Sequence, residues 1–398
     1  MRSKRMQLAP ALAALAGTLI FCGCAQPGQA AEGSLKAFIL VGQSNMEGKA
    51  TAGTLDAVID DPGTHDQFKH LKAGDQWAVR EDVWVAFLDR QGKSDLPLYG
   101  PLTVGFGSPK TARDENNKRV PVRTIGPELG IGYVLGNHFD EQVLLVKAAW
   151  GGRAVRYSFR PPSAMPTDEQ IRQEVAEITK KKPDAGVTFE SRKAGYGSDY
   201  RKILSETRKV LGDLKRYFPA YDAGKGYEIT GFIWFQGWND GVGGGNPDYV
   251  EQMAHFIRDI RRDLETPNLP FVIGELGTDG PEAGGWVATF RKQQAAIAAL
   301  LEFAGTVRLA KTAPFWPTYP NLEKEWQAFR AAAKANEEKS KTDPTRVDPG
   351  AYYQKNWVQR YKKELAYTSD KRYHYKGSGA CYYQMGEAMG KAMLEMIK

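Results

Sequence analysis

The sequence predicts an α/β protein with a mainly parallel sheet and helices on both of its faces. Short apolar runs bounded by turn residues recur along the chain, as expected of buried strands. Longer segments with a helical apolar period alternate with them, which is typical of strand–helix–strand units. With 398 residues, of which 42% are hydrophobic, the chain can bury a sizeable core.

Five apolar runs are expected to form buried strands, at residues 35–41, 83–88, 142–149, 229–235 and 269–276. Five amphipathic segments predict helices at residues 128–139, 199–217, 247–264, 286–303 and 378–397. In the second of these, Ile203, Val210 and Leu214 fall on one stripe. Ligands of parallel sheets bind at the carboxyl ends of the strands, so we expect the functional site there.

Two stretches, 155–198 and 313–350, interrupt this alternation with proline-rich and charged sequence. We interpret them as insertions that surround one end of the sheet. No internal repeat is visible in the sequence. The expected organisation is therefore one domain over residues 34–398 with two enlarged loops.

The first residues are typical of an export signal. Basic residues precede an apolar stretch at 8–21 that is too short for a membrane span, which predicts a signal peptide over 1–24 and a tether over 25–33. A Gly-Cys junction makes Cys24 a candidate for lipidation, and ordinary cleavage near residues 30–31 is the alternative. In both cases we expect an exported protein that is periplasmic, extracellular or lipid-anchored to a bacterial membrane.

Charge and cysteine content exclude several classes of protein. The chain has 54 Lys+Arg against 47 Asp+Glu, a net charge of +7, and the basic residues are scattered among acidic ones, so a nucleic-acid partner is not expected. Beyond the tether, Cys381 is the only cysteine, which rules out an internal disulfide, and the Cys-x-x-Cys spacing of zinc sites is absent. We expect no metal or organic cofactor.

A serine follows the first predicted strand directly, in the segment GQSNM at residues 42–46. The glycine permits a sharp turn, so Ser44 is placed to present its hydroxyl at the catalytic edge of the sheet. A helix cap without catalytic role is the alternative. The G-x-S-x-G elbow of lipases is not matched, because Met46 stands in place of the second glycine.

The fourth predicted strand runs into Gly237 and Asn239, which supply a backbone N–H and a carboxamide. An oxyanion hole requires donors of this kind. The alternative is a simple turn before the glycine-rich run at 241–245. That run lacks the G-x-G-x-x-G and G-K-[ST] patterns, so a phosphate loop is not indicated.

The chain has five histidines. His374 follows Asp370 at a distance of four residues, just before the last predicted helix, and such a pair can activate a nucleophilic serine. An incidental spacing of the two residues is the alternative. His65 and His70 lie in a polar region, where a metal site remains a further interpretation.

Taken together, these segments resemble the sialate O-acetylesterase branch of the SGNH hydrolases, which also includes acetylxylan esterases. Besides the C-terminal Asp/His pair, the motifs are GQSNM (42–46), IGPELG (125–130), KAAWGG (147–152) and WFQGWND (234–240). The resemblance covers most of the chain from residue 35, apart from the two insertions. It implies a flavodoxin-like three-layer α/β/α sandwich and the hydrolysis of O-acetyl esters.

By this resemblance, Ser44 is the nucleophile, His374 is the general base and Asp370 is the acid that orients it. Family members usually have Asp-x-x-His, whereas three residues separate the pair in this chain. Some relatives work with a dyad, and Glu275 or Asp240 are the alternative acids.

The resemblance also implies three oxyanion donors: the Ser44 backbone N–H, the Asn239 side chain and a glycine of the second motif block. That glycine is Gly126 or Gly152, and we prefer Gly152 because it follows a strand end. The segment at 238–240 is Trp-Asn-Asp, where acetylesterases of this branch commonly have Glu-Ser-Asp. The substrate of the well-known members therefore does not transfer directly.

Residues beside the catalytic ones are candidates for substrate binding, namely Gln43, Gln236, Trp238, Arg153 and Tyr373. Aromatic faces stack on sugar rings, and a guanidinium can pair with a carboxylated sugar. Further aromatic candidates are Trp150, Trp286, Trp316 and Tyr375, whereas Trp234 lies within a predicted strand and is expected in the core.

We therefore predict a serine carbohydrate esterase that removes O-acetyl groups from a glycan or acylated sugar. Its expected partner is an acetylated carbohydrate. The alternatives are a catalytically silent carbohydrate-binding lipoprotein on the same scaffold, a glycan O-acetyltransferase, and a metal hydrolase that uses His65 and His70.

Overall fold

The computed structural model describes residues 33–90, 98–113 and 118–397. The predicted signal peptide at 1–24, with Cys24, and residues 25–32 of the predicted tether lie outside these ranges. Within the described ranges, no helix combines the length and the apolar character needed to cross a membrane.

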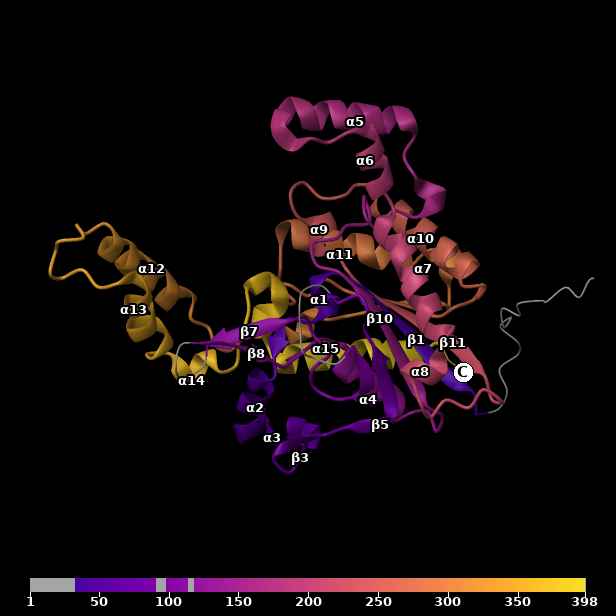
Figure 1. Ribbon diagram of the computed structural model, residues 1–398, viewed down its shortest axis with the longest axis horizontal. Helices are drawn as coiled ribbons and strands as arrows, with labels where there is room; N and C mark the ends of the chain where they lie inside the picture. Colours follow the sequence, from indigo (N-terminus) through magenta and orange to yellow (C-terminus); the bar gives the residue numbers. More distant parts are fainter. Residues whose placement is uncertain (1–32, 91–97, 114–117, 398) are drawn as a thin grey trace, which may run out of the picture.

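A seven-stranded sheet forms the centre of the protein (Figure 1). Its strand order is β13-β12-β11-β1-β10-β5-β6, and all neighbours are parallel except β5 and β6. The strands are β1 (Leu35–Gly42), β5 (Arg80–Ala86), β6 (Tyr99–Leu102), β10 (Val143–Ala149), β11 (Tyr227–Phe235), β12 (Phe271–Gly274) and β13 (Val307–Ala310). All five predicted strands are present, which confirms the α/β fold class and the mainly parallel sheet.

Two strands of this sheet, β6 and β13, were not predicted. Strand β13 is the four-residue segment VRLA, and β6 is an edge strand that contains Gly100 and Pro101. Such short runs carry too few apolar residues to be distinguished from loops. Three small antiparallel pairs lie outside the main sheet: β2 (Ala50–Thr51) with β9 (Thr124–Ile125), β3 (Lys72–Ala73) with β4 (Gln76–Trp77), and β7 (Lys110–Arg113) with β8 (Arg119–Val122).

The five predicted helices are present, and one of them is divided. Helix α7 ends at Leu211 and α8 begins at Leu214, so that Gly212 lies at the break of the segment predicted as one helix. The α-helices are α1 (Ser44–Glu47), α2 (Gly53–Asp60), α3 (His65–Phe68), α4 (Glu128–Gly136), α5 (Asp168–Lys181), α6 (Phe189–Gly195), α7 (Ser198–Leu211), α8 (Leu214–Tyr217), α9 (Trp238–Gly241), α10 (Tyr249–Asp263), α11 (Gly285–Ala298), α12 (Glu323–Glu337), α13 (Pro349–Tyr353), α14 (Lys362–Leu365) and α15 (Gly379–Leu394).

Helices cover both faces of the sheet, as the side chains of β1 show. Phe38 and Leu40 belong to one core cluster, together with residues of α4 and α15, whereas Ile39 and Val41 belong to a second cluster with residues of α7, α10 and α11. Successive side chains of a strand point to opposite faces, so one buried strand contributes to two cores. The result is the three-layer α/β/α sandwich expected from the sequence.

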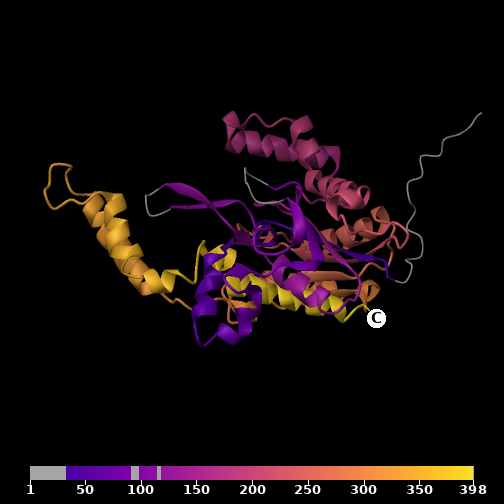
Figure 2. The same cartoon turned by 60° about the horizontal axis from the view of Figure 1, so that its bottom comes forward.

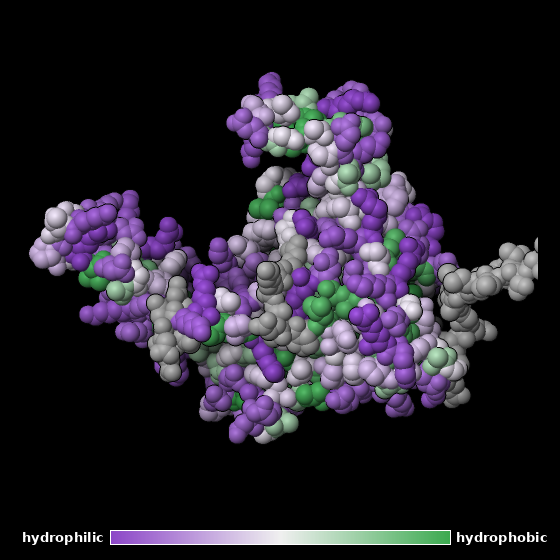
Figure 3. Space-filling model, viewed as in Figure 1, coloured by the Kyte–Doolittle hydropathy of each residue, from purple (hydrophilic) through white to green (hydrophobic). Residues whose placement is uncertain are grey.

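Two helical segments project from this body in both views (Figures 1 and 2). One contains α5 and α6, within residues 155–198. The other, which we call the arm, contains α12, α13 and α14 and spans residues 323–365. Both projections present a mainly hydrophilic surface with scattered apolar residues (Figure 3).

Candidate active site

Three loops that carry predicted site residues start side by side. In the register of the parallel sheet, Gly42 at the end of β1 pairs with Ala149 at the end of β10 and with Phe235 at the end of β11. The backbone continues this contact beyond the strands, because Trp150 N donates to Gly42 O at 3.2 Å and Gln43 N donates to Phe235 O at 3.4 Å. The three loops therefore leave the sheet at one edge, at the carboxyl ends of their strands.

Ser44 lies at this edge, at the first residue of α1, with 8% of its surface exposed. The preceding Gly42 is required by packing. A Cβ at this position would lie 2.1 Å from Phe235 O and 2.8 Å from Met46 Cβ. Only glycine lets β11 and α1 approach the end of β1 so closely, which places the serine directly above the sheet.

His374 and Asp370 are in contact. The Nδ1 atom of His374 lies 2.9 Å from Asp370 Oδ1, and Lys110 on β7 forms an ion pair with the other carboxylate oxygen. Burial alone would raise the pKa of Asp370, but the hydrogen bonds from His374 and Lys110 outweigh it and hold this pKa well below its usual range. Asp370 is therefore an anion that accepts a hydrogen bond from His374 Nδ1. This leaves Nε2 as the ring nitrogen that can take up or release a proton.

A tight loop accommodates the long Asp-x-x-x-His spacing. The backbone N–H groups of Ser369 and Asp370 both donate to Lys376 O, at 2.8 and 3.0 Å. Tyr375, Lys376 and Gly377 have φ angles of 52°, 53° and 63°, in the left-handed region. A Cβ at Gly377 would lie 2.5 Å from Ser369 Oγ, so this loop closes on itself and turns His374 back onto Asp370.

The serine and histidine segments are joined through their neighbours. Asn45 Nδ2 donates to Tyr373 O at 3.3 Å, and Tyr382 on α15 donates to Asn45 Oδ1 at 3.0 Å. Both Ser44 and His374 are described by the structure, and no hydrogen bond joins their side chains. Catalytic hydrogen bonds of this type often shorten only when substrate is bound.

The two candidate oxyanion glycines differ in whether their N–H is available. Gly126 N donates to Glu128 Oε1 at 2.8 Å, and Glu128 is held in turn by buried Lys147, whose Nζ lies 2.6 Å from Oε2. Burial lowers the pKa of Lys147 to about 8, against the attraction of Glu128. Gly152 has φ 73° and is exposed, with open space where a Cβ would be. This geometry favours Gly152 over Gly126 as a donor.

Gln236 connects the three strand-end loops. Its Nε2 donates to Gln43 Oε1 at 3.3 Å, to Arg153 O at 3.1 Å and to Asp240 Oδ2 at 2.7 Å. Asp240 also accepts from Val155 N at 2.7 Å, and burial raises its pKa although these hydrogen bonds oppose it. Gln43 and Gln236 are only 1% and 3% exposed, so both serve the alignment of the loops.

The other acids considered as partners of the imidazole have different neighbours. The carboxylate oxygens of Asp240 accept from the loop network, and Glu275 Oε2 accepts from Ala313 N at 3.4 Å. Of the three acids, Asp370 is the one in contact with His374.

A row of aromatic rings begins beside His374. The ring of Tyr373 lies 4.4 Å from His374, Trp238 lies 5.2 Å from Tyr373, and Trp286 lies 5.1 Å from Trp238, each measured between centroids. Trp286 is 36% exposed and borders a cavity of about 280 Å³ beside the glycine run at 243–245. Trp238 and Asn239 start α9 and are half-buried. These rings provide apolar faces next to the Asp–His pair.

Other residues predicted to bind substrate are occupied by protein contacts. Arg153 Nε lies 3.1 Å from Asp199 Oδ2, so an ion pair partly offsets its charge, while 37% of the side chain stays exposed. Trp150 and Tyr375 are completely buried, so the expectation of a sugar contact at these two residues is wrong. Trp316 is half-buried and packs with its ring centroid 5.8 Å from that of Tyr375. Trp234 is also completely buried, as expected.

His65 and His70, which were considered above as metal ligands, each have a hydrogen-bond partner of their own. His65 Nδ1 lies 2.7 Å from Ile59 O, and His70 Nε2 lies 2.8 Å from the hydroxyl of Tyr383. Burial lowers the pKa of His70. Among the described residues, no group of three or more His, Cys, Asp or Glu side chains is arranged to hold a metal ion.

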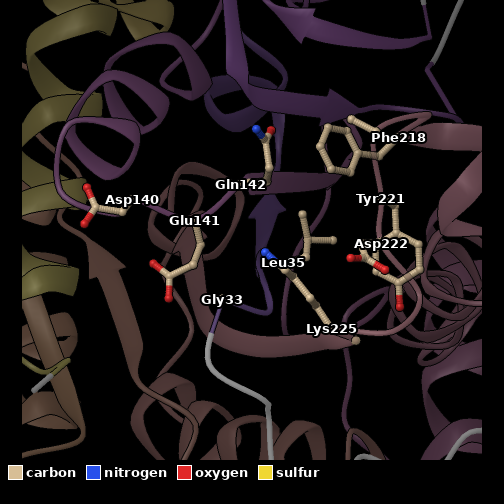
Figure 4. Close-up of a pocket in the computed structure, with 11 residues that line it drawn as sticks. Gly33, Leu35, Asp140, Glu141, Gln142, Phe218, Tyr221, Asp222 and Lys225 are labelled. Atoms are coloured by element: carbon tan, nitrogen blue, oxygen red, sulfur yellow. The ribbon is translucent and has the colours of Figure 1, made fainter.

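A further cavity of about 490 Å³ lies at the opposite end of the sheet (Figure 4). It is lined by Leu35, where β1 begins, and by Gln142, which precedes β10. Asp140, Glu141 and Lys225 surround it in the same view. Because parallel strands run from this edge to the other, this cavity is remote from Ser44.

Comparison with solved structures finds matches at low sequence identity. A protein of Arabidopsis thaliana is 17% identical over 82% of this chain and 97% of its own, with a TM-score of 0.37. A carbohydrate acetylesterase from Xanthomonas citri is 16% identical over 69% of this chain and 49% of its own, with a TM-score of 0.38. NanS is 16% identical over 70% of this chain and 78% of its own, with a TM-score of 0.39.

A search of curated protein sequences finds no match to the chain. A family model does match, and its description is carbohydrate esterase, sialic acid-specific acetylesterase. The match spans residues 34–311, which is most of the chain and includes Ser44, Gly152, Gln236 and Asn239. The chain therefore belongs to the sialic acid-specific acetylesterase family of carbohydrate esterases and is a hydrolase of ester bonds.

Proposed function

We propose that the protein removes O-acetyl groups from a glycan by a serine-hydrolase mechanism, with Ser44 as nucleophile, His374 as general base and Asp370 as the orienting acid. The observation that carries this proposal is the 2.9 Å contact between His374 and Asp370 at the edge of the sheet where Ser44 lies. The hydrogen bond from Asn45 to Tyr373 O supports it, because it joins the two segments next to the reacting residues.

In the first half of the reaction, His374 takes the proton of the Ser44 hydroxyl as the Ser44 oxygen attacks the acetyl carbonyl. The Ser44 and Gly152 N–H groups and the Asn239 carboxamide stabilise the negative oxygen of the tetrahedral intermediate. His374 then donates its proton to the sugar oxygen, which leaves as a hydroxyl. The anionic Asp370 stabilises the imidazolium in between.

In the second half, a water molecule attacks the acetyl-serine. His374 takes a proton from this water, and the new tetrahedral intermediate uses the same oxyanion donors. Collapse of the intermediate returns the proton to Ser44 and releases acetate. Apart from this water, every catalytic group in the two halves is a side chain or a backbone N–H of this chain.

The row formed by Tyr373, Trp238 and Trp286 supports a sugar as the alcohol part of the ester. Aromatic faces bind the C–H faces of sugar rings, and this row begins next to the general base. The alternative of a catalytically silent carbohydrate-binding protein was based on the irregular Asp–His spacing. The loop at 369–377 accommodates that spacing, which removes the reason for this alternative. Esterase activity is thus the function that the geometry supports best.

Hydrolysis of p-nitrophenyl acetate tests this proposal. We expect Ser44→Ala to lower turnover by about 10⁵-fold and Asn239→Ala by about 10²- to 10³-fold. Ser205→Ala, a substitution at an exposed serine of α7, should leave turnover unchanged. Turnover that persists in Ser44→Ala would contradict the mechanism, and transfer of acetyl groups to excess sugar would show an acetyltransferase.

A further inference from the structure

A groove lies between the arm and the loop that carries the Asp–His pair. Its volume is about 580 Å³. Trp326, Tyr353 and Trp357 of the arm side line it, and Asp370 and Lys371 line it from the loop. This volume is within the range of about 300–1,000 Å³ that is typical of small-ligand sites.

The aromatic residues of the arm form their own cluster. Trp326 stacks on Phe329 with centroids 5.4 Å apart, and Trp357 lies 4.7 Å from Trp326 and 5.4 Å from Phe329. None of these three residues belongs to the core clusters found in the described part of the chain. The cluster therefore stiffens the arm without adding to the main core, and Tyr353 beside it remains 39% exposed.

The groove adjoins the catalytic pair. Asp370 lines it and contacts His374, and Lys371 is the next residue along the chain. Lys371 is exposed, and no ion pair involves it among the described residues. The groove is built from residues beyond 311, where the family match ends, so family membership does not assign it.

We propose that this groove binds the sugar chain that carries the acetyl group, so that the substrate is an oligo- or polysaccharide. The proposal rests on the proposed esterase function. Flat aromatic side chains along one wall fit the apolar faces of sugar rings, and an exposed ammonium opposite them can donate to hydroxyl or carboxylate oxygens.

The test compares the kinetics of the enzyme on a small ester with its kinetics on an acetylated oligosaccharide. We would measure KM and kcat for p-nitrophenyl acetate and for an acetylated xylo-oligosaccharide in wild type, Tyr353→Ala, Trp326→Ala and Lys371→Ala. We expect KM for the oligosaccharide to rise about five- to tenfold in the aromatic variants, with unchanged kinetics on the small ester. Phe189→Ala, at an aromatic residue of the other projection, is the matched control and should change neither.

Binding of the deacetylated oligosaccharide to Ser44→Ala, with and without Tyr353→Ala, separates the groove from the chemistry. Weaker binding in the double variant supports the groove even where the esterase proposal fails. Equal KM values for the oligosaccharide in all variants, or an equal rise in Phe189→Ala, would overturn the inference. So would a dimer in gel filtration that Tyr353→Ala dissociates. Tyr353 and Lys371 are exposed, so their variants are informative even if Trp326→Ala loosens the arm.

Discussion

Two lysine–carboxylate pairs flank the candidate site, and they differ in burial. Lys147 and Glu128 are 0% and 1% exposed, and Lys147 also donates to the backbone oxygens of Glu47 and Phe106 at 2.9 and 2.8 Å. Lys110 and Asp370 are 19% and 15% exposed, and Asp370 uses its second oxygen for His374. The two pairs thus have different surroundings: the buried pair joins segments beneath the site, and the half-buried pair contacts His374, the proposed general base.

The largest effect is expected from a substitution in the half-buried Lys110–Asp370 pair, and it is an effect on kcat. Asp370→Asn keeps the shape of the side chain but presents a neutral amide to Nδ1, so the imidazole loses the anion that stabilises its protonated form. We expect kcat for p-nitrophenyl acetate to fall by about 10³- to 10⁴-fold. Circular dichroism should show an unchanged fold. A kcat within about tenfold of wild type would mean that another acid orients His374.

Breaking the buried pair should act on stability instead. Lys147→Met leaves the Glu128 carboxylate buried without its cation, which should lower the free energy of unfolding by about 3–5 kcal/mol in urea denaturation. The double variant Lys147→Met with Glu128→Gln should recover part of this loss, because no unpaired charge remains. An unchanged unfolding midpoint with lower kcat would reverse the roles assigned to the two pairs.

A substitution at Lys110 tests the half-buried pair without changing the imidazole, because Lys110 contacts Asp370 and not His374. Lys110→Met should lower kcat by about tenfold, equivalent to about 1.4 kcal/mol, since Asp370 loses its ion pair with a lysine. Lys110→Arg keeps the charge and should restore most of the activity. A similar loss in both variants would indicate that Lys110 matters for packing alone.

The smallest effect is the dependence of stability on pH. Because the pKa of Asp370 is lowered in the folded state, the carboxylate contributes stability above the ordinary Asp pKa of about 3.9 and loses it as the pH falls toward the folded value. The difference in unfolding free energy between wild type and Asp370→Asn should therefore be constant near neutral pH and shrink below about pH 4. A difference that grows in acid would contradict the assignment of Asp370 as an anion.

The strands and the serine could be predicted because their signals are local. Apolar runs bounded by turns identified five of the seven strands, and Gly42 before Ser44 indicated a sharp turn. Strands β6 and β13 were missed because each is only four residues long and is interrupted by Gly and Pro or by Arg. Trp150 was misjudged because its place after a strand resembles a loop, although the fold buries it completely.

The contacts of the base could be predicted only in part. A four-residue separation suggested the Asp370–His374 pair, but its geometry depends on left-handed backbone at Tyr375 and Lys376, which their residue types do not reveal. Lys110 was missed because it lies about 260 residues from Asp370 in the chain and belongs to no motif. The insertion predicted at 313–350 includes α12 but ends before most of α13 and before α14, and the groove beside the arm depends on tertiary packing.

The proposed mechanism requires His374 to take the proton of the Ser44 hydroxyl as Ser44 attacks the acetyl carbonyl carbon. Labelling with a fluorophosphonate, followed by peptide mass spectrometry, tests it most directly, because the reagent forms a stable bond only with a base-activated serine. We expect stoichiometric modification of Ser44 in wild type and none in His374→Ala. Modification of a different serine, or equal labelling of Ser44 in His374→Ala, would contradict it.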